Sequence, residues 1–357
     1  MSVVLEVLDL ARWAPSGDNS QPWRFEVLGD DHVVVHAFDT RRDCVYDLEG
    51  HASQLAVGAL LETIRIAAGA HQRVARIVRR PEAPLETPVF DVRFELAPEL
   101  PHEDLHLAIR DRSVMRKPLS IRSLRAGDKE RLESAVGQAY RVIWFESAAD
   151  RLRLAWLAVK SAKIRLTIPE AYAVHRQIIE WNARFSEDRV PDQALGADAL
   201  SLRSMRWVMA SWDRVQLMNR YFGGTLVPRL QLDLLPGLFC AAHFALVARR
   251  PPEDIDDYVR AGEAVQRFWL TATTLGLQLQ PQYTPLVFAE YVRRRVEFTS
   301  VPSARRRAAW VERRLARLLG EEAAPATVFL GRLGFGSPHF ARSLRLPLER
   351  LVVPVPP

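Results

Sequence analysis

The chain contains little cysteine, little lysine and no long hydrophobic run. Its two cysteines, Cys44 and Cys240, are far apart and form no CxxC motif, which argues against a disulfide framework or a cysteine metal site. No apolar stretch reaches the roughly 18 residues that a membrane span needs. The N-terminus lacks a basic segment followed by a long apolar one, so we expect no signal peptide. These absences predict a cytoplasmic protein with no membrane partner.

The positive charge of the chain is almost entirely arginine. The formal net charge is +6. The lysines are Lys117, Lys129, Lys160 and Lys163. Arginine runs at 293–295 and 305–307 fall in segments with helical periodicity, and no aromatic platform is interleaved with them. We therefore interpret these runs as solvated helix faces and expect no nucleic-acid partner.

The first hundred residues alternate between helical and strand patterns. Hydrophobic residues make up 48% of the chain, which is enough for one large core or two adjoining ones. Apolar residues recur at helical spacing over 3–14 and 53–70. Strand patterns occupy 23–28, 32–38, 74–79 and 89–97. This half is predicted to be α+β.

Near Pro101 the pattern starts again. A helix is expected that begins at Leu105 and ends in 112–116, then a second helix over about 127–137 and a strand over 140–145. A helix, a short link and a strand with an aromatic residue also describe residues 3–28, which predicts a weak internal repeat. We therefore divide the chain into halves at 1–100 and 101–357.

The second half contains a long insertion and further helices. Residues of about 150–225 look mostly helical, with a polar stretch at 183–200, and are interpreted as a lid or insertion. The apolar stretch 236–247 is predicted to be helical, as are 256–275 and 301–319. A last strand at 327–330 runs into the glycine-rich segment 331–336.

The segment Ala14-Pro15-Ser16-Gly17-Asp18-Asn19-Ser20-Gln21-Pro22-Trp23 joins a helix directly to a strand. It is dense in hydrogen-bonding side chains and has open backbone amides around its glycine. Such a loop suits a flat heteroaromatic ligand edged with donors and acceptors. It is also built from turn residues, so an ordinary helix-to-strand turn is the alternative interpretation.

This segment resembles the flavin-contacting loop of the FMN-dependent nitroreductase superfamily, which has the pattern APSxxNxQPW. In that family the loop lies over the FMN ring and ribityl chain at an interface between two subunits or half-domains. The resemblance implies that Pro15, Ser16, Asn19 and Gln21 contact FMN.

Two basic segments of the second half resemble the phosphate-binding parts of the same family. Arg112-Ser113-x-x-Arg116 is similar to its Arg-Ser-x-Arg motif, with one extra residue before the second arginine. Arg342-Ser-Leu-Arg345-Leu-Pro is similar to its C-terminal segment, whose arginine meets the FMN phosphate. Arginines suit a phosphate because they bind it as fixed forks. The alternatives are a cationic helix end and a basic surface tail.

A fourth segment, Leu275-Gly-Leu-Gln-Leu-Gln280-Pro281, resembles the family's Leu-Gly-Leu-Gly segment that passes the flavin edge. Gln278 replaces the second glycine. The resemblance implies flavin contacts from Gln280 and Pro281, and a backbone amide near 280–282 that faces flavin N5. A glycine C-cap followed by a strand is the alternative.

The distribution of these motifs implies a pseudo-dimer. The first half keeps the flavin loop but lacks the arginine motif, whereas the second half keeps the arginines and has lost the loop. One chain would then hold a single FMN between its halves, as in the Acg-like duplicated branch of the superfamily. The implied architecture is an α+β nitroreductase-like fold, present as a monomeric pseudo-dimer or a homodimer.

The resemblance implies an oxidoreductase that passes hydride or electrons through flavin N5 to or from a small organic substrate. NADH or NADPH would act as a transient reductant, and no catalytic proton donor is identified from the sequence. Two alternatives remain within the flavin interpretation. The protein would bind or sequester FMN under a lid with little turnover, or it would be a partner-dependent dehydrogenase acting on a carrier or peptide.

A zinc hydrolase is the competing interpretation from another class. His102-Glu103-Asp-Leu-His106 fits the pattern HExxH, in which two histidines on one helix face bind zinc and the glutamate acts as general base. Pro101 places the first histidine at the very start of any helix, and no third ligand is indicated. We therefore expect these residues to be solvated and predict no metal.

Overall fold

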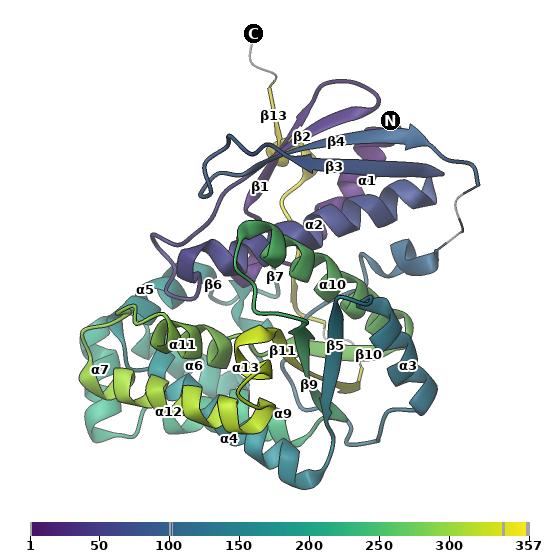
Figure 1. The fold of residues 1–357 in the computed structure, drawn as a ribbon. Coiled ribbons are helices and arrows are strands. Elements are labelled where there is room, and N and C mark those ends of the chain that lie inside the picture. Colours follow the sequence, from purple (N-terminus) through teal and green to yellow (C-terminus); the bar gives the residue numbers. More distant parts are fainter. Residues whose placement is uncertain (1, 100, 102, 338–339, 355–357) are drawn as a thin grey trace.

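The polypeptide forms two main β-sheets, each covered by helices, which meet along a pair of long helices (Figure 1). Two further sheets have two short strands each. In the computed structural model, residues 2–99, 101, 103–337 and 340–354 are described. No helix among these residues is long and apolar enough to cross a membrane.

The first sheet is built mainly from the N-terminal hundred residues. Its strand order is β13-β1-β2-β4-β3. The strands are β1 (Trp23–Val27), β2 (His32–Ala37), β3 (Arg73–Arg79), β4 (Val89–Leu96) and β13 (Val352–Val353). β13 pairs in parallel with β1, so the C-terminal segment crosses back to the first half.

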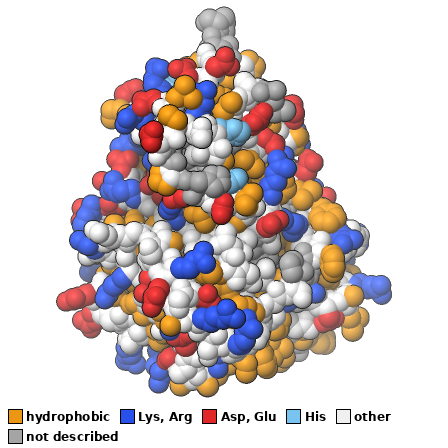
Figure 2. Space-filling view, turned by 90° about the vertical axis from the view of Figure 1, so that its right-hand side faces the viewer, with side chains coloured by type: hydrophobic (Ala, Val, Ile, Leu, Met, Phe, Trp, Pro, Cys, Tyr) orange, Lys and Arg blue, Asp and Glu red, His pale blue; other side chains and the backbone are white. Residues whose placement is uncertain are grey.

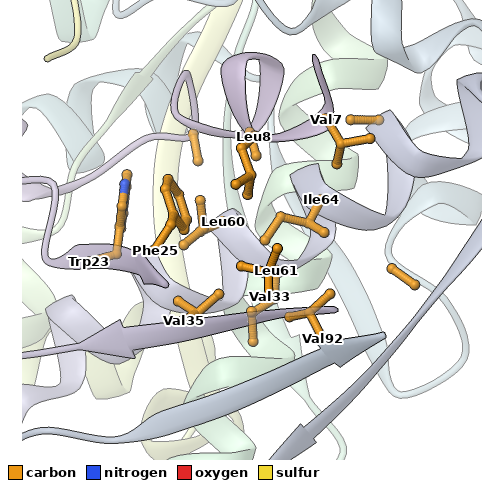
Figure 3. Close-up of a cluster of buried hydrophobic side chains, with 14 of the residues drawn as sticks. Val7, Leu8, Trp23, Phe25, Val33, Val35, Leu60, Leu61, Ile64 and Val92 are labelled. Carbon is orange, nitrogen blue, oxygen red and sulfur yellow. The ribbon is translucent and has the colours of Figure 1, made fainter. Parts of the chain in front are cut away.

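One face of this sheet packs against two helices, α1 (Val3–Ala11) and α2 (His51–Ala70). Alternate residues of the strands point inward, as expected for a sheet with one solvated face. The buried side chains drawn in Figure 3 come from both helices and from the strands. They are Val7, Leu8, Trp23, Phe25, Val33, Val35, Leu60, Leu61, Ile64 and Val92. This core positions the loop between α1 and β1.

The second sheet has the strand order β10-β11-β9-β5. The strands are β5 (Tyr140–Phe145), β9 (Ala242–Ala248), β10 (Leu277–Pro281) and β11 (Thr327–Phe335). Its principal helices are α3 (Ala126–Ala135) and α10 (Ile255–Thr274). The helix predicted over 236–247 is wrong, because most of this stretch is β9, and α9 (Leu235–Leu238) is a single turn. β9 is buried along nearly its whole length, so its continuous apolar sequence lacks the alternation that marks a half-buried strand.

The two sheets repeat one topology. The first has the order β1-β2-β4-β3 and the second the order β5-β9-β11-β10, and all these neighbouring strands are antiparallel. In each, a helix of 20 residues connects the second strand to the third. The internal repeat predicted from the sequence is therefore present in the strand order. The paired helices α2 and α10 lie side by side between the sheets (Figure 1).

A helical insertion separates β5 from β9. Its helices are α4 (Ala148–Arg165), α5 (Pro169–Ile178), α6 (Ala199–Val208), α7 (Trp212–Tyr221), α8 (Leu226–Arg229), a π-helical turn η5 (Leu230–Leu234) and α9. The polar stretch within it contains short strands, β6 (Ile179–Glu180), β7 (Phe185–Ser186) and β8 (Val190–Pro191), and the 3₁₀ helix η4 (Asp192–Ala194).

The remaining elements complete the chain. Between β10 and β11 are α11 (Thr284–Arg293), α12 (Pro302–Leu319) and α13 (Ala323–Ala326). Near the C-terminus are β12 (Arg342–Ser343) and α14 (Leu348–Leu351). Short 3₁₀ helices are η1 (Gly17–Asn19), η2 (Leu48–Gly50) and η3 (Asp104–Ala108).

Two further expectations about local structure need correction. The helix expected to begin at Leu105 and end in 112–116 is only the 3₁₀ helix η3, after which the chain turns and has no regular structure except a bridge at Val114. The last strand does not end at 330, because β11 continues through the glycine-rich segment to Phe335. A Cβ on Gly331 would lie 2.6 Å from Cζ of Phe244, so glycine there permits close packing inside the sheet.

Candidate functional site

The loop between α1 and β1 has an unusual backbone. Asp18, Asn19 and Gln21 adopt positive φ angles of 53°, 64° and 46°. Left-handed backbone is costly for residues other than glycine and persists only where the surroundings impose it. Three such residues within four positions therefore identify a loop that is held in one conformation by its contacts.

The buried amides of Asn19 and Gln21 supply those contacts. Asn19 Nδ2 donates to the carbonyl oxygens of Glu187 and Arg189 at 3.1 and 3.2 Å. Gln21 Nε2 donates to the Glu187 oxygen at 2.8 Å, and Gln21 Oε1 accepts from the amide of Leu346 at 2.9 Å. The loop is thus joined to the helical insertion and to the C-terminal segment. Asn19 Oδ1 is buried and has no hydrogen-bond partner among the described residues.

Three arginines converge at the start of this loop. Arg112 Nη2 donates to the carbonyl oxygen of Trp13 at 2.9 Å, and Arg345 Nε donates to that of Ala14 at 3.0 Å. Arg342 Nη2 donates to the carbonyl oxygen of Arg112 at 3.2 Å. The two basic segments singled out in the sequence therefore meet at one point, against the first half. We call Arg112, Arg342 and Arg345 the arginine cluster.

The positive charge of the arginine cluster is opposed only in part, by the charge of Asp111, which raises the pKa of Arg342 against the effect of burial. Within the part of the chain that the structure describes, none of its members forms an ion pair with an acidic side chain. Burial, followed by the charges of the other two, lowers the pKa of Arg112, and burial and Arg342 lower that of Arg345 to about 9. A guanidinium keeps its proton at neutral pH, so these arginines stay charged, and their burial and mutual repulsion destabilise the protein when no anion is bound. The buried Nε atoms of Arg112 and Arg342 also have no hydrogen-bond partner among the residues that the structure describes, and the cluster is therefore suited to an anion.

Arg116 does not join the cluster but lies at the other end of the loop. Burial raises the pKa of Asp18, and the charges of Arg116 and Arg165 oppose this rise, which places both arginines close to the carboxyl group. Arg112 to Arg116 covers four residue steps, which span at most about 13 Å. It runs beside the loop from Ala14 to Asp18, with the arginine cluster at one end and Asp18 at the other.

The same segment is attached to the edge of the second sheet. Met115 N donates to the Leu279 oxygen of β10 at 2.9 Å, and Val114 forms a parallel bridge with Leu279. β10 therefore lies next to the segment. The local alternative for 275–281 is realised, since Gly276 has a φ of 70° after α10 and precedes the strand.

Several of the other residues predicted to contact FMN already form hydrogen bonds within the protein. Gln280 Oε1 accepts from Arg332 Nε at 2.8 Å, and the backbone amide of Gln282 donates to Leu330, so both groups already have protein partners. Ser16 Oγ accepts from the amide of Gln21 at 3.0 Å. Pro15, Ser113 and Pro281 are half-buried.

Sequence reasoning missed Arg332, which organises the segment that carries the arginines. Its side chain is fully buried, and Nη2 donates to the carbonyl oxygens of Met115, Arg116 and Lys117 at 2.9–3.0 Å. All three bonds come from this one nitrogen, whose two hydrogens are shared among three successive carbonyl oxygens. Its position within the glycine-rich segment hid it.

A polar cluster at the border of the first half and the insertion was also missed. Tyr46 Oη and His175 Nε2 are 3.0 Å apart, and Arg165 pairs with Asp233 at 3.2 Å. Burial and nearby arginines lower the pKa of His175 to about 3, so this histidine is neutral. Asp18 is within electrostatic reach of Arg165. No spacing in the sequence connects these residues, because they come from separate elements.

The geometry of the HExxH segment differs from that of a zinc protease. His102 lies outside the described residues. Glu103 has extended backbone before η3 and forms an ion pair with Arg267 at 2.8 Å. His106 Nδ1 lies 3.0 Å from the carbonyl oxygen of Glu103. Glu103 is therefore not on a helix, where the motif requires it.

Comparison with known proteins finds relatives of undetermined function. No family model matches the chain. It is similar to the uncharacterised protein MT1398 of Mycobacterium tuberculosis (strain CDC 1551 / Oshkosh), with 23% identity over 281 residues, 77% of this chain and 38% of that protein. It is also similar to the uncharacterised protein Rv3127 of strain ATCC 25618 / H37Rv, with 29% identity over 200 residues, 54% of this chain and 57% of that protein. The aligned segments thus span less than two thirds of either relative.

The solved structures that the chain matches are nitroreductase-like. A nitroreductase-like family protein from Bacillus cereus has 10% identity and a TM-score of 0.35, over 70% of this chain and 95% of that chain. A nitroreductase with bound FMN from Bacteroides fragilis NCTC 9343 has 10% identity and a TM-score of 0.33, over 66% and 90% of the two chains. The FMN-dependent nitroreductase NfnB from Mycobacterium smegmatis, in complex with NADPH, has 14% identity and a TM-score of 0.33, over 68% and 94%. At these TM-scores we transfer no ligand or activity from them.

Proposed function

We propose that this chain binds FMN between its two halves and acts as a nitroreductase-type oxidoreductase. The observation that carries the proposal is the arginine cluster, in which two buried arginines and the half-buried Arg342 meet at the start of the first-half loop without an ion pair to any described acidic residue. A dianionic phosphate would offset the mutual repulsion of Arg112, Arg342 and Arg345. It would also accept from the Nε atoms of Arg112 and Arg342, which otherwise have no partner.

The two segments that leave the cluster supply the rest of the binding site. Ala14 to Asp18 and Arg112 to Arg116 run side by side over a length of about 13 Å at most, which accommodates a ribityl chain and leads to a ring beyond it. Asn19 Oδ1 is an unpartnered buried acceptor beside this path. Pro15, Ser16 and Ser113 lie along the same segments. Gln21 acts indirectly, because its hydrogen bonds hold the loop in shape.

When bound, FMN supplies hydride or electron transfer at N5, with NADH or NADPH as transient reductant. The protein's own contributions are binding, orientation and charge. Arg116 lies at the end of the path away from the phosphate and would stabilise negative charge there. The substrate would be a small organic molecule. Motifs in both halves contribute to one site, so we further infer a pseudo-dimer with one FMN per chain, located in the cytoplasm.

The first test is the visible absorption spectrum of the purified protein, with the released chromophore identified and metal assayed on the same sample. We expect close to one FMN per chain. Light scattering on the same sample measures the mass of the particle and so the number of chains in it. Arg345→Met should lower FMN affinity at least 30-fold, which is about 2 kcal/mol. Arg176→Met, an exposed arginine of α5, is the matched control and should bind normally. A colourless protein that fails to bind added FMN would overturn the proposal.

A second function is favoured by the contacts of the insertion. Asn19 and Gln21 donate to the carbonyl oxygens of Glu187 and Arg189, so the insertion packs directly on the proposed flavin loop. A lid held in this way would limit access of a nicotinamide and leave a protein that binds FMN with little turnover. Stopped-flow reduction by NADH and NADPH discriminates the two. Reduction within seconds supports the oxidoreductase, whereas stoichiometric FMN that neither nucleotide reduces supports sequestration.

A further inference from the structure

A cavity of about 790 Å³ lies beside the proposed flavin path, on the other side of the segment after Arg112. Arg112 and Arg116 contact or face the first half, whereas Met115 and Lys117 line the cavity. Its other walls come from the insertion and from Gly336, Ser337, Phe340 and Ala341. None of the residues proposed to contact FMN lines the cavity, so the two proposed sites share no described residue.

Four basic side chains line this cavity: Lys117, Arg184, Arg203 and Arg206. Arg203 and Arg206 are three residues apart on α6 and therefore lie on one face of that helix. Among the described residues, neither of them nor Lys117 has an ion-pair or hydrogen-bond partner for its side chain, and Arg184 donates only to a carbonyl oxygen. Converging cations of this kind create a positive potential that attracts anions.

The one acidic side chain on the described lining, Asp192, offsets only part of the charge of the four basic ones. Both carboxylate oxygens of Asp192 accept from backbone amides, those of Asn182 and Ala183, at 3.0 and 3.1 Å. Many arginines elsewhere have acidic partners, for example Arg165 with Asp233 and Arg267 with Glu62. On the face shown in Figure 2, acidic side chains are interspersed among the basic ones. The cavity differs from this pattern, because its basic side chains form no ion pair with a described acidic residue.

The cavity also presents an aromatic surface. Phe340 is 80% exposed, which is unusual for so large an apolar side chain. The guanidinium of Arg184 lies 5.6 Å from its ring centroid and 5.2 Å from that of Phe185. Met115 and Leu119 add apolar surface to the wall. A planar ring next to clustered cations is a combination that recognises aromatic anions.

We propose that this cavity binds a multiply anionic ligand with an aromatic ring, of the class of nucleoside diphosphates and triphosphates, independently of FMN. Arg203, Arg206 and Lys117 contact the phosphates, and Phe340 with Arg184 stacks on the base. The volume fits this class, since pockets for such ligands measure roughly 300–1,000 Å³. The site requires no flavin chemistry, so it stands apart from the proposed oxidoreductase function.

The test is calorimetric titration of the full chain, as purified, with ADP, inorganic pyrophosphate and adenosine. We expect ADP to bind most tightly, pyrophosphate more weakly and adenosine weakest, with ADP affinity falling as KCl is raised. The double variant Arg203→Ser, Arg206→Ser should weaken ADP at least 30-fold and leave the FMN content unchanged. Because α6 has no buried residues, this variant should fold. Phe340→Leu should weaken ADP but not pyrophosphate.

The matched control is Arg313→Ser, Arg317→Ser on α12, which removes the same charge from two exposed arginines on another helix. It should bind ADP like the wild type. Equal losses in both double variants would mean non-specific attraction and would overturn the proposal. So would displacement of ADP by excess FMN, which would make the two sites one, or no ADP binding at millimolar concentration.

Discussion

Gly58 of α2 and Gly262 of α10 face each other where the two halves of the chain meet. A Cβ on Gly58 would lie 3.0 Å from Gly262 Cα and 1.9 Å from the carbonyl oxygen of Val259, and one on Gly262 would lie 2.0 Å from the Leu55 oxygen. The two helices are therefore in backbone contact, which side chains of any size would prevent. This contact joins the repeated sheets and brings the first-half loop to the arginines of the second half.

Gly58→Ala should destabilise the protein strongly, because the helices must separate to accept even one methyl group. We expect a loss of about 3 kcal/mol in the free energy of unfolding, measured by urea denaturation, at the upper end for overpacked contacts. Gly69→Ala is the control on the same helix, since a Cβ there has nothing within 4 Å. It should be neutral or stabilising by up to about 1 kcal/mol from helix propensity. Equal effects of the two variants would show that the crossing is not tight.

The arginine cluster predicts opposite effects of one substitution on stability and on binding. Arg345→Met removes a buried charge that the neighbouring Arg342 disfavours, at the expense of hydrogen bonds to two carbonyl oxygens. In protein stripped of FMN we expect the free energy of unfolding to rise by about 1 kcal/mol, because an unpaired buried charge costs more than those bonds return. A lower free energy of unfolding would show that Arg345 is mainly structural.

Secondary structure could be predicted correctly where the hydrophobic periodicity extends over many residues. It was predicted wrongly where contacts with distant parts of the chain determine the local conformation. Helices α2 and α10 were found within two residues at each end, because each has a long apolar face. β9 was mistaken for a helix, because it is buried on both faces and shows no alternation. The segment after η3 was mistaken for helix, because its pairing with Leu279 depends on the second sheet.

Residues of the candidate site could be identified from sequence motifs, but the contacts that they make could not. Arg112, Arg342 and Arg345 were singled out from local patterns, and the structure brings them together. The bonds from Asn19 to residues 187 and 189 could not be foreseen, because the insertion's position depends on packing across the whole chain. Arg332 carries no signal of its own beyond a charge within a buried strand.

The contact between the insertion and the flavin loop predicts how access is controlled. Asn19→Ala removes two hydrogen bonds to the exposed residues Glu187 and Arg189. We expect amide hydrogen exchange of 186–190 to rise about tenfold, corresponding to roughly 1.4 kcal/mol, and reduction of bound FMN by NADH to accelerate. Ser343→Ala is the companion variant, because it removes only a hydroxyl donor to the Arg189 oxygen.

If both variants loosen the segment and speed reduction, the insertion acts as a lid. If only Asn19→Ala changes reduction, the side chain acts on FMN directly and the lid interpretation fails.

Buried neutral histidines predict loss of stability in mild acid. Burial lowers the pKa of His243 to about 4 and that of His175 to about 3. The unfolded chain takes up these protons near pH 6.5 and the folded chain does not, so the free energy of unfolding falls as pH decreases from 6.5 towards 4. His243 alone contributes a loss of about 3 kcal/mol across this window.

Urea denaturation at pH 7.5, 6.0 and 5.0 measures this dependence. His243→Gln and His175→Gln should each flatten the pH profile while lowering stability at pH 7.5. A wild-type profile that is flat between pH 7 and 5, or variants that keep its slope, would contradict the assignment of neutral histidines.

Arg332 should govern the segment on which both proposed ligand sites depend. Its three bonds to the carbonyl oxygens of residues 115–117 fix the chain between the arginine cluster and the cavity. Arg332→Met leaves those carbonyls unpaired and should lower the free energy of unfolding by about 3 kcal/mol or more. Arg332→Lys should recover only part of this, since an ammonium group cannot reproduce the planar fork.

Hydrogen exchange separates this positioning role from a general loss of stability. In Arg332→Met, the amides of 114–118 should exchange faster than those of β9, which belongs to the same sheet. Gln280→Met is the control, because it removes only the partner of Arg332 Nε and leaves the three carbonyl bonds in place. It should cost about 1 kcal/mol without selective exchange at 114–118. Uniform exchange across β9 and 114–118 in Arg332→Met would mean that Arg332 merely supports the sheet.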